Sequence, residues 1–483
     1  MGSMVQLGLL IRLVTFAGLL VTLTSCRWAS VNPLVKQDHA AFTQVAAMTA
    51  LNRNLSSTGV QNVGAASERR LTIENCRRIG LANNLSMQTS KLDELAKTDL
   101  SLGEWAKMFP HAIMSAKFDE GDNILYSDIE GDSYWAGFYE RSAWRFFLEA
   151  RWSPTDAALA YYLAKNGENR ILESRYETTR VAQKIIEAVE VAFFRLLSIQ
   201  ECLPLASKLV SMREQVSGEL RDLTQEKLVS MADYHRAMHA EMNARSILSQ
   251  LTSDAERQRT HLLAAMGLTR NCEISGASLV VSGELKSSSK PYDVKDAELE
   301  ALKNRPEAYR AGLKHFDSIN DFRKSIVKNF PRVNLFWRYL NDRYTHPYDK
   351  TKQQAGILFY FDVSEWLTNF AESRAASRGA VKTEKEAVVV ALAIASQARI
   401  AAAKYLWALE QVGIKEHSLC SSRTLLEVAK ARADSDDLDK LAEKQARADT
   451  ILANIEWLRT LGEANISLAE LQCVTGRNYK MVW

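Results

Sequence analysis

The sequence repeats itself once, and this internal duplication constrains the fold more than any other feature. Two matches share an offset of 221 residues: 81–84 (LANN) with 302–305 (LKNR), and Phe109-Pro110 with Phe330-Pro331. Four more share an offset of 209: Trp152 with Phe361, Asp156 with Glu365, Arg195 with Lys404, and Met266-Gly267 with Thr475-Gly476. Matches in this order over most of the chain predict one structural unit built twice.

Each copy carries the same order of signals. A helix that ends at Phe-Pro comes first, two strand-like runs follow, and a very long helical stretch then turns back and closes near a glycine. Only 8 Pro and 21 Gly occur in 483 residues, which favours long helices. The hydrophobic content of 47% and charged content of 25% argue against a disordered chain and against a polytopic helical membrane protein. Lys and Arg (61) nearly balance Asp and Glu (58), so no basic surface for nucleic acid is predicted.

Four runs with period-two alternation are predicted strands: 111–118, 143–152, 332–340 and 355–361. Their aromatic residues fall on the apolar face: Trp144, Phe146, Trp152, Trp337, Tyr339, Phe359 and Phe361. Charged residues such as Arg145, Glu149 and Arg338 fall on the other face. Runs of about ten residues with this pattern suit the wall of a membrane β-barrel with a wet lumen. A soluble sheet packed on a core is the alternative.

Four strands are too few to close a barrel, and an open sheet edge is not tolerated in lipid. If these strands span a membrane, several chains must share one barrel. The strand count therefore predicts an oligomer.

The long helical stretches carry a heptad-like seam. In the first copy the seam comprises Ile185, Val189, Ala192, Leu196, Ile199 and Leu203, and after a slip Leu205, Leu209, Met212 and Val216. From Asp156 to Gly218 a continuous helix would be about 90 Å long, which predicts a coiled-coil hairpin. Pro204 is expected to kink this helix or to mark its division into segments.

The first 26 residues have the form of an export signal. Arg12 precedes a short apolar run at 13–23, which is too short to span a bilayer comfortably. The following Leu23-Thr24-Ser25-Cys26 resembles a bacterial lipobox, so that Cys26 would become the lipidated first residue of the mature protein. Ordinary cleavage and an uncleaved anchor are the alternatives. Residue 27 is Arg and not Asp, which favours the outer membrane over the inner one.

No catalytic or metal-binding pattern is found. Five further cysteines, Cys76, Cys202, Cys272, Cys420 and Cys473, show no zinc-type spacing and are expected to be inert thiols. His235 and His239 stand four apart, as metal ligands on a helix can, but no third ligand accompanies them, and a polar helix face is the simpler interpretation. The chain is therefore not expected to be an enzyme.

Several stretches resemble the TolC-like outer-membrane efflux factors over residues 70–480. Residues 70–88 (RLTIENCRRIGLANNLSMQ) and 301–311 (ALKNRPEAYRA) resemble the helix that opens each repeat of this family. Residues 152–164 (WSPTDAALAYYLA) resemble its strand-to-helix junction, although the glycine after the Asp is Ala157 or Ala158 here. Residues 465–478 (NISLAELQCVTGRN) resemble its closing helix.

The resemblance implies a mainly α-helical chain with a membrane β-barrel. Three chains would form a homotrimer with a twelve-stranded barrel and a long α-helical tunnel in the periplasm. Loops 119–142 and 341–352 would face outside. The expected segments are a lipoprotein signal peptide (1–25), a lipidated segment (26–69), a first repeat (70–270, helical hairpin 156–267), a linker (271–300) and a second repeat (301–483, helical hairpin 365–476).

The resemblance also places a gate at the tips of the two helical hairpins. In the second repeat, 422–431 (SRTLLEVAKA) resembles an entrance constriction with an Arg followed by acidic residues four and seven positions later. Arg423 and Glu427 match, but the third position is Lys430. The matching tip of the first repeat is 216–224, where Gly218 would permit the turn and Arg221 and Asp222 are candidate partners. A solvated charge run at a helix end is the alternative.

The implied function is that of an outer-membrane channel in a tripartite efflux system. The protein would be a passive exit duct for small molecules in a Gram-negative outer membrane, and it would dock with a periplasmic adaptor protein and an inner-membrane pump. No cofactor is implied beyond the covalent lipid on Cys26. Two alternatives remain: an outer-membrane conduit for type I protein secretion, and a lipid-anchored coiled-coil scaffold without a channel.

Overall fold

The computed structural model describes residues 70–120, 142–226, 228–268, 280–285, 292–342, 351–432 and 437–479. All of these residues belong to one compact unit, Glu68–Trp483. The expected signal peptide (1–25), the segment 26–69 with Cys26, and Cys272 lie outside the described residues. Most of the two expected outer loops, 121–141 and 343–350, also lies outside them.

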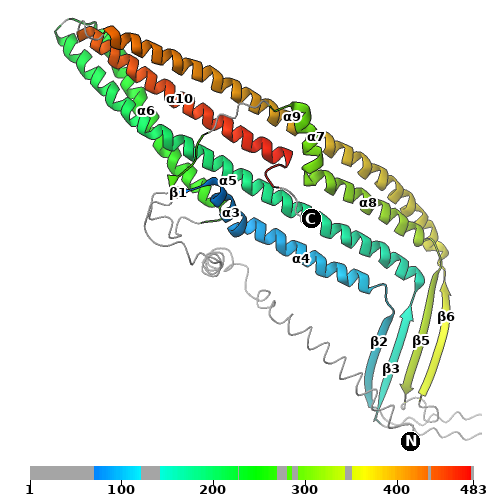
Figure 1. The fold of residues 1–483 in the computed structure, drawn as a ribbon. Coiled ribbons are helices and arrows are strands. Elements are labelled where there is room, and N and C mark those ends of the chain that lie inside the picture. Colours follow the sequence, from blue (N-terminus) through cyan, green and yellow to red (C-terminus); the bar gives the residue numbers. More distant parts are fainter. Residues whose placement is uncertain are drawn as a thin grey trace, which may run out of the picture. The chain divides into compact units, whose positions relative to one another are not determined.

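The described elements occur in the same order twice (Figure 1). The first set is α3 (Ile73–Asn83), α4 (Leu85–Ala106), β2 (His111–Glu120), β3 (Ser142–Trp152), α5 (Pro154–Gln225) and α6 (Met231–Ala265). The second set is α7 (Val294–Asn304), α8 (Pro306–Val327), β5 (Arg332–Asp342), β6 (Thr351–Tyr360), α9 (Val363–Arg432) and α10 (Asp437–Thr475). Corresponding helices have similar lengths: α3 and α7 have 11 residues each, α4 and α8 have 22 each, and α5 and α9 have 72 and 70.

The helix expected before each Phe-Pro pair is in fact two helices. In the first set the break falls at Asn84, whose side chain caps α4 by accepting a hydrogen bond from the Ser86 amide at 2.9 Å. In the second set it falls at Arg305, and Pro306 begins α8, where a missing amide proton costs nothing. The expected linker 271–300 is also not all linker, because α7 begins at Val294 and the short strand β4 (Val280–Val281) pairs in parallel with β1 (Arg70–Leu71).

Two glycines at corresponding positions allow the end of each helical hairpin to pack closely against a short helix. Gly267 and Gly476 follow the last residues of α6 and α10 with φ angles of +72° and +73°, which residues with a Cβ rarely adopt. A Cβ on Gly267 would lie 2.7 Å from the Asn83 carbonyl oxygen, and one on Gly476 would lie 2.9 Å from the Asn304 Cβ. The end of each hairpin therefore packs against the end of the first short helix of its own repeat.

The heptad-like seam of α5 is largely buried, as the pattern predicts. Ile185, Val189 and Leu196 pack with Leu262 of α6 and with Met266, which follows α6, in one apolar cluster. Towards the tip, the seam continues into a second cluster that includes residues of α6 and α10. Pro204 lies inside α5, which runs as one helix from Pro154 to Gln225. Of the two expected effects of Pro204, the division into segments is therefore wrong, and the kink stays a prediction.

The four longer strands form one antiparallel sheet in the order β2-β3-β5-β6. The sheet lies at one end of the long helices (Figure 1). All four predicted strands are confirmed, with changed ends. The largest change concerns the last strand, which spans Thr351–Tyr360, so that Phe361 lies just beyond it. Because β3 pairs directly with β5, the two repeats contribute two strands each to a single sheet.

Candidate functional site

One face of the sheet is largely apolar, and polar positions on it such as Asn341, Thr351 and Gln353 fall at the ends of β5 and β6 that lead into the connection between them. Residues paired across neighbouring strands share a face, and the register joins Ala112, Ala150, Trp337 and Ala355 in one row. The rows on either side of it add Met114, Leu148, Tyr339, Trp152, Leu335 and Ile357, and the rows beyond them add Phe118, Trp144, Phe146 and Phe359. The predicted alternation of both repeats therefore converges on one surface.

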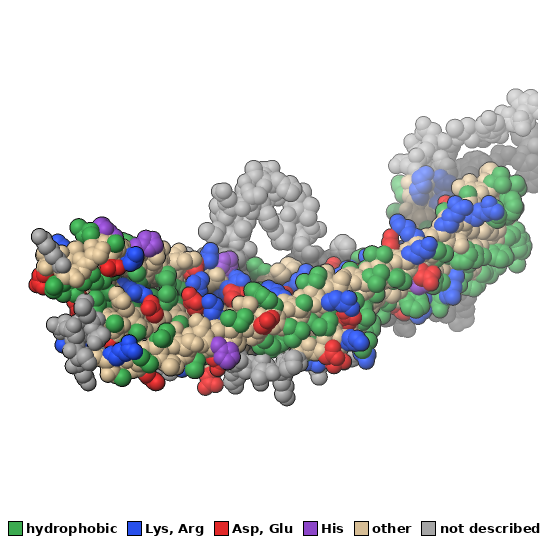
Figure 2. All heavy atoms as spheres, turned by 90° about the horizontal axis from the view of Figure 1, so that it is seen from above, with side chains coloured by type: hydrophobic (Ala, Val, Ile, Leu, Met, Phe, Trp, Pro, Cys, Tyr) green, Lys and Arg blue, Asp and Glu red, His purple; other side chains and the backbone are tan. Residues whose placement is uncertain are grey.

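These aromatic side chains are not in a core. Trp144 is 54% exposed, Trp337 40% and Phe359 71%. In Figure 2 hydrophobic side chains gather at the sheet end, at the right of the view. An apolar surface of this kind on the described chain calls for a non-aqueous environment or for a partner.

The opposite face of the sheet holds a charged cluster. Glu149 on β3 is only 3% exposed and accepts hydrogen bonds from two arginines: Arg151 Nη2 at 2.7 Å and, across the strand pair, Arg338 Nη2 at 3.1 Å. The Arg338 guanidinium lies 5.4 Å from the centre of the Phe147 ring. The alternation places these residues on the polar face, but their pairing depends on the β3–β5 register, which the sequence pattern leaves open.

Both edges of the sheet end without a neighbour in the described part of the chain. The edge strands are β2 and β6, each of 10 residues. Their outer backbone groups can accept further strands. Because β2 and β6 stand at opposite edges, copies of the chain joined β2 to β6 would continue the sheet and its apolar face.

The helix α9 carries an apolar surface that its own chain leaves uncovered. Among the described helices it alone has a stretch long and apolar enough to cross a membrane by length and composition, and only 17% of that stretch is buried. Val388, Val389 and Leu392 are more than half exposed. The same helix packs along α8 and α10, so within the chain its apolar stretch is covered only in part.

The second hairpin tip holds three of the predicted gate residues. Arg423, Glu427 and Lys430 lie in the last turns of α9 and are all exposed. Although Arg423 and Glu427 are one helical turn apart, no ion pair joins them in the described part of the chain. The connection 433–436 lies outside the described residues.

The first hairpin tip is not where the glycine placed it. Gly218 lies inside α5, which continues to Gln225 before the chain turns back into α6 at Met231. A Cβ on Gly218 would meet nothing within 4 Å, so no close approach requires a glycine there. Arg221 and Asp222 are therefore exposed residues of the last turns of α5, near the tip but not at the turn.

Three of the cysteines are buried thiols, as expected. Burial raises the pKa of Cys76 and of Cys202 to about 11, and that of Cys473 to about 12. Such thiols are poor nucleophiles at neutral pH. Cys420 is free and exposed on α9. His239 lies beside Asn243, with Nδ1 3.3 Å from the amide nitrogen, and His235 is exposed.

Comparison with solved structures identifies the fold. The outer-membrane channel OprN aligns with a TM-score of 0.69 at 15% identity, over 84% of this chain and 89% of that one. The Campylobacter jejuni CmeC outer-membrane channel gives 0.68 at 11% identity, over 84% and 86%. The open state of the Neisseria gonorrhoeae MtrE outer-membrane channel gives 0.66 at 13%, over 86% and 94%.

These structures are outer-membrane channels of the TolC type, so the expected fold of the single chain, long helices with a small antiparallel sheet, is confirmed. No protein-family model matches the sequence, and no curated protein sequence matches it. The likeness thus extends over most of the chain in three dimensions, at a sequence identity of 15% or less in the three structures compared.

Proposed function

We propose that this chain, which has the fold of TolC-type outer-membrane channels, is one third of a homotrimeric exit duct in a Gram-negative outer membrane. Three sheets would close one twelve-stranded barrel, and the long helices would continue it as a tunnel through the periplasm. The duct would be passive and would serve a tripartite efflux system. A passive duct needs no catalytic site.

The observation that carries this proposal is the four-stranded sheet with one apolar face and two free edges. A water-soluble monomer would leave that face and both edges exposed, whereas a ring of copies removes the edges and turns the apolar face to lipid. The polar face, with Glu149 and Arg338, would then line a wet lumen. A coiled-coil scaffold without a channel gives no role to this sheet.

The uncovered apolar stretch of α9 supports the same assembly. In a closed tube every long helix has a neighbour on each side. Within the chain, α9 contacts α8 and α10 but leaves Val388, Val389 and Leu392 exposed. A neighbouring chain would cover them, and their burial would stabilise the trimer by about 25 cal/mol for each Å² removed from water.

The lipid on Cys26 would tether the duct to the outer membrane beside its barrel. The export signal and the lipobox-like residues before Cys26 support this anchor. Labelling of cells with a radioactive fatty acid tests it. Wild-type protein should incorporate label and the Cys26→Ala variant should not, and label retained by Cys26→Ala would contradict the assignment.

The hairpin tips would be the end that meets a periplasmic adaptor protein and an inner-membrane pump. Opening would untwist the helices at the tips and separate charged residues such as Arg423 and Glu427 from contacts with neighbouring helices of the ring. The Arg423→Ala/Glu427→Ala variant should then conduct more in a planar bilayer than the wild type. A conductance equal to that of the wild type would remove these residues from the gate.

Reconstitution of the purified protein in planar lipid bilayers tests the channel function itself. Wild-type protein should give discrete conductance steps, and detergent-extracted protein should run on gels as a trimer that dissociates only on heating. Absence of both would contradict the proposed duct. Accumulation of small dyes in cells that lack the protein would favour efflux, whereas loss of a secreted protein would favour type I secretion.

A further inference from the structure

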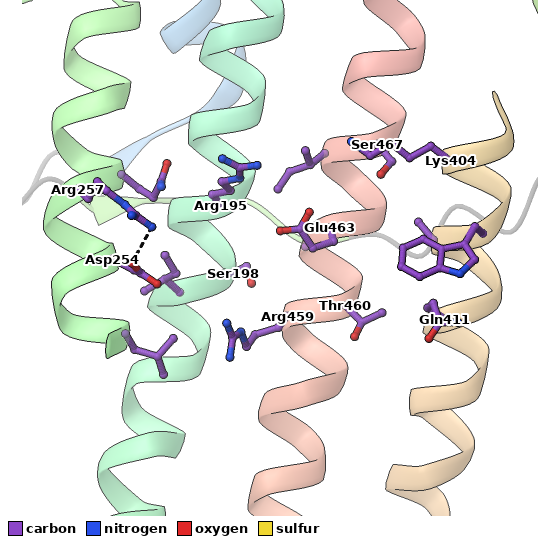
Figure 3. A pocket seen from close by; sticks show the side chains of 17 residues that line it. Arg195, Ser198, Asp254, Arg257, Lys404, Gln411, Arg459, Thr460, Glu463 and Ser467 are labelled. Atoms are coloured by element: carbon purple, nitrogen blue, oxygen red, sulfur yellow. Dashed lines mark hydrogen bonds and ion pairs between the residues drawn. The ribbon is translucent and has the colours of Figure 1, made fainter. Parts of the chain in front are cut away.

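A groove of about 560 Å³ crosses the four long helices near the middle of the hairpins. Figure 3 shows α6, α5, α10 and α9 side by side beneath it. Its volume lies in the range of ligand pockets, roughly 300–1,000 Å³. The tip and barrel residues discussed above take no part in it.

The groove is built from corresponding positions of the two repeats. At the offset of 209 residues, Arg195 corresponds to Lys404, Asp254 to Glu463, and Gln258 to Ser467, and all six line the groove. At these matched positions each repeat contributes one cation, one carboxylate and one neutral polar residue, and the first repeat also adds Arg257. The second repeat adds Arg459 and Trp407, whose counterparts are Gln250 and Ser198.

The groove lies on the face of the helices that points away from the short elements. On α5, Phe193 and Leu197 pack with Val281 of β4, and Arg195 stands two residues from each. Two residues turn an α-helix by about 200°, so Arg195 points the opposite way. On α9, Tyr405 packs with Ala297 of α7, and Trp407, again two residues further, is 62% exposed.

In the proposed trimer this face has to be the inner one. Twelve helices spaced about 10 Å apart enclose a ring of about 38 Å between axes, which leaves an opening of about 28 Å. A second layer of short helices, about 10 Å thick, on the inside would nearly fill that opening. The layer of α3, α7, β1 and β4 must therefore lie outside, and the groove faces the lumen.

The groove has an excess of positive charge. Four cations and two carboxylates line it. Arg257 is paired with Asp254 at 2.8 Å, and Lys404 is paired with Glu470 outside the groove. Arg195 and Arg459 are exposed and form no ion pair with any described residue. In Figure 3 they extend over the seam between α5 and α10, with Ser198 between them.

The floor of the groove carries two hydrogen-bonding side chains, and α5 and α10 lie close together beneath it. Gln258 and Ser467 are 6% and 3% exposed, and neither side chain has a hydrogen-bond partner among the described residues. A Cβ on Gly462 would lie 2.6 Å from the Ser198 Cβ, so that α5 and α10 meet closely there. The polar atoms of Gln258 and Ser467 are not among the fully buried ones without a partner, so they remain open to water or to a ligand in the groove.

We propose that this groove is a docking site in the lumen for organic anions with a flat aromatic body. Arg195 and Arg459 would bind the anionic groups, Gln258 and Ser467 would donate hydrogen bonds to them, and Trp407 would stack on the aromatic body. The inference rests on the proposed duct, since only a tube turns the groove towards a solute. With three copies, three such grooves would ring the tunnel at one level.

Block of the channel by an aromatic trisulfonate, pyranine, tests the proposal. In planar bilayers of full-length protein, pyranine should reduce the wild-type conductance in a concentration-dependent way. The Arg195→Gln/Arg459→Gln variant should need about tenfold more pyranine for half-block, because charge-assisted hydrogen bonds are lost. Arg195→Lys/Arg459→Lys should retain most of the block, and Trp407→Ala should weaken it.

Arg78→Gln is the matched control, since Arg78 is an exposed cation of α3, in the outer layer. Its half-block concentration should equal that of the wild type. A conducting wild type that pyranine does not block, or blocks equally in Arg195→Gln/Arg459→Gln, would overturn the docking site and leave the duct intact. Absence of any conductance would instead contradict the duct.

Discussion

Glu190 and Glu307 are carboxylates of the helical part with different arginine partners. Glu190 is 1% exposed and lies 2.7 Å from one guanidinium, that of Arg77. Burial outweighs this partner and raises the pKa of Glu190 above its ordinary value. Burial also acts to raise the pKa of Glu307, but hydrogen bonds from Arg305 and the charges of Arg180 and Arg305 outweigh it, so that the pKa of Glu307 is lowered.

The lowered pKa of Glu307 predicts a contribution to stability that disappears in acid. The contribution is present above the ordinary glutamate pKa, near 4.5, and is lost as the pH falls through the folded-state value. Glu307→Gln should therefore destabilise the protein at pH 7, by about 1–3 kcal/mol, because two arginines lose their charge partner. Thermal unfolding of detergent-solubilised protein between pH 3 and pH 8 should show the deficit shrinking in acid.

Glu190→Gln serves as the opposite case. Since the pKa of Glu190 is raised, its ionised form costs stability as the pH rises through the folded-state value. The stability of Glu190→Gln relative to the wild type should therefore increase with rising pH. The relative stability of Glu307→Gln should instead decrease with rising pH. Equal pH profiles for both variants would contradict this account. The sequence shows none of this, because Arg77 and Glu190 are far apart along the chain.

Substitution by alanine should have opposite effects on stability at Gly218 in α5 and at Gly476 after α10. Gly476→Ala should destabilise the protein by about 1–2 kcal/mol, since its φ of +73° and its contact with Asn304 leave no room for a Cβ. Gly218→Ala should stabilise α5 by up to about 1 kcal/mol, since this glycine is helical and unobstructed. Melting temperatures that move in the same direction would show that Gly218 has a turn role after all.

At the scale of elements, two adjacent residues of β6 distinguish the faces of the sheet. Ala355 lies on the apolar face beside Trp337, and Gln354 lies on the polar face beside Arg338. Ala355→Arg should weaken assembly by about 2–4 kcal/mol if the first face meets lipid. Gln354→Arg should have little effect, because its side chain would be solvated. The heat resistance of the extracted trimer measures both, and equal loss in the two variants would contradict a lipid-facing surface.

The strands and their faces could be predicted from the sequence because alternation is a local signal. Which strands pair with each other, and in which register, could not be predicted from the sequence. The pairing of Glu149 with Arg338 requires β3 to lie beside β5. The end of α5 at Gln225 was missed for a related reason: a helix held by a long buried seam tolerates Gly218 within it.

At the scale of the whole molecule, one duplicated unit accounts for both the sheet and the helices. Each repeat supplies two strands and two long helices, and the chain remains open at both sheet edges and along α9. The strand count indicated an oligomer from the sequence alone. The groove with Arg195 and Arg459 could not be foreseen, because it needs four helices in their packed order.

Imaging of single particles of the detergent-purified protein tests the central claim most directly. If three copies share one barrel, averaged end-on views should show threefold symmetry around a central opening, and side views should show a long tube with a wider belt of detergent at the sheet end. Particles containing one chain, with the Trp144 and Trp337 face in water and no opening, would contradict the account.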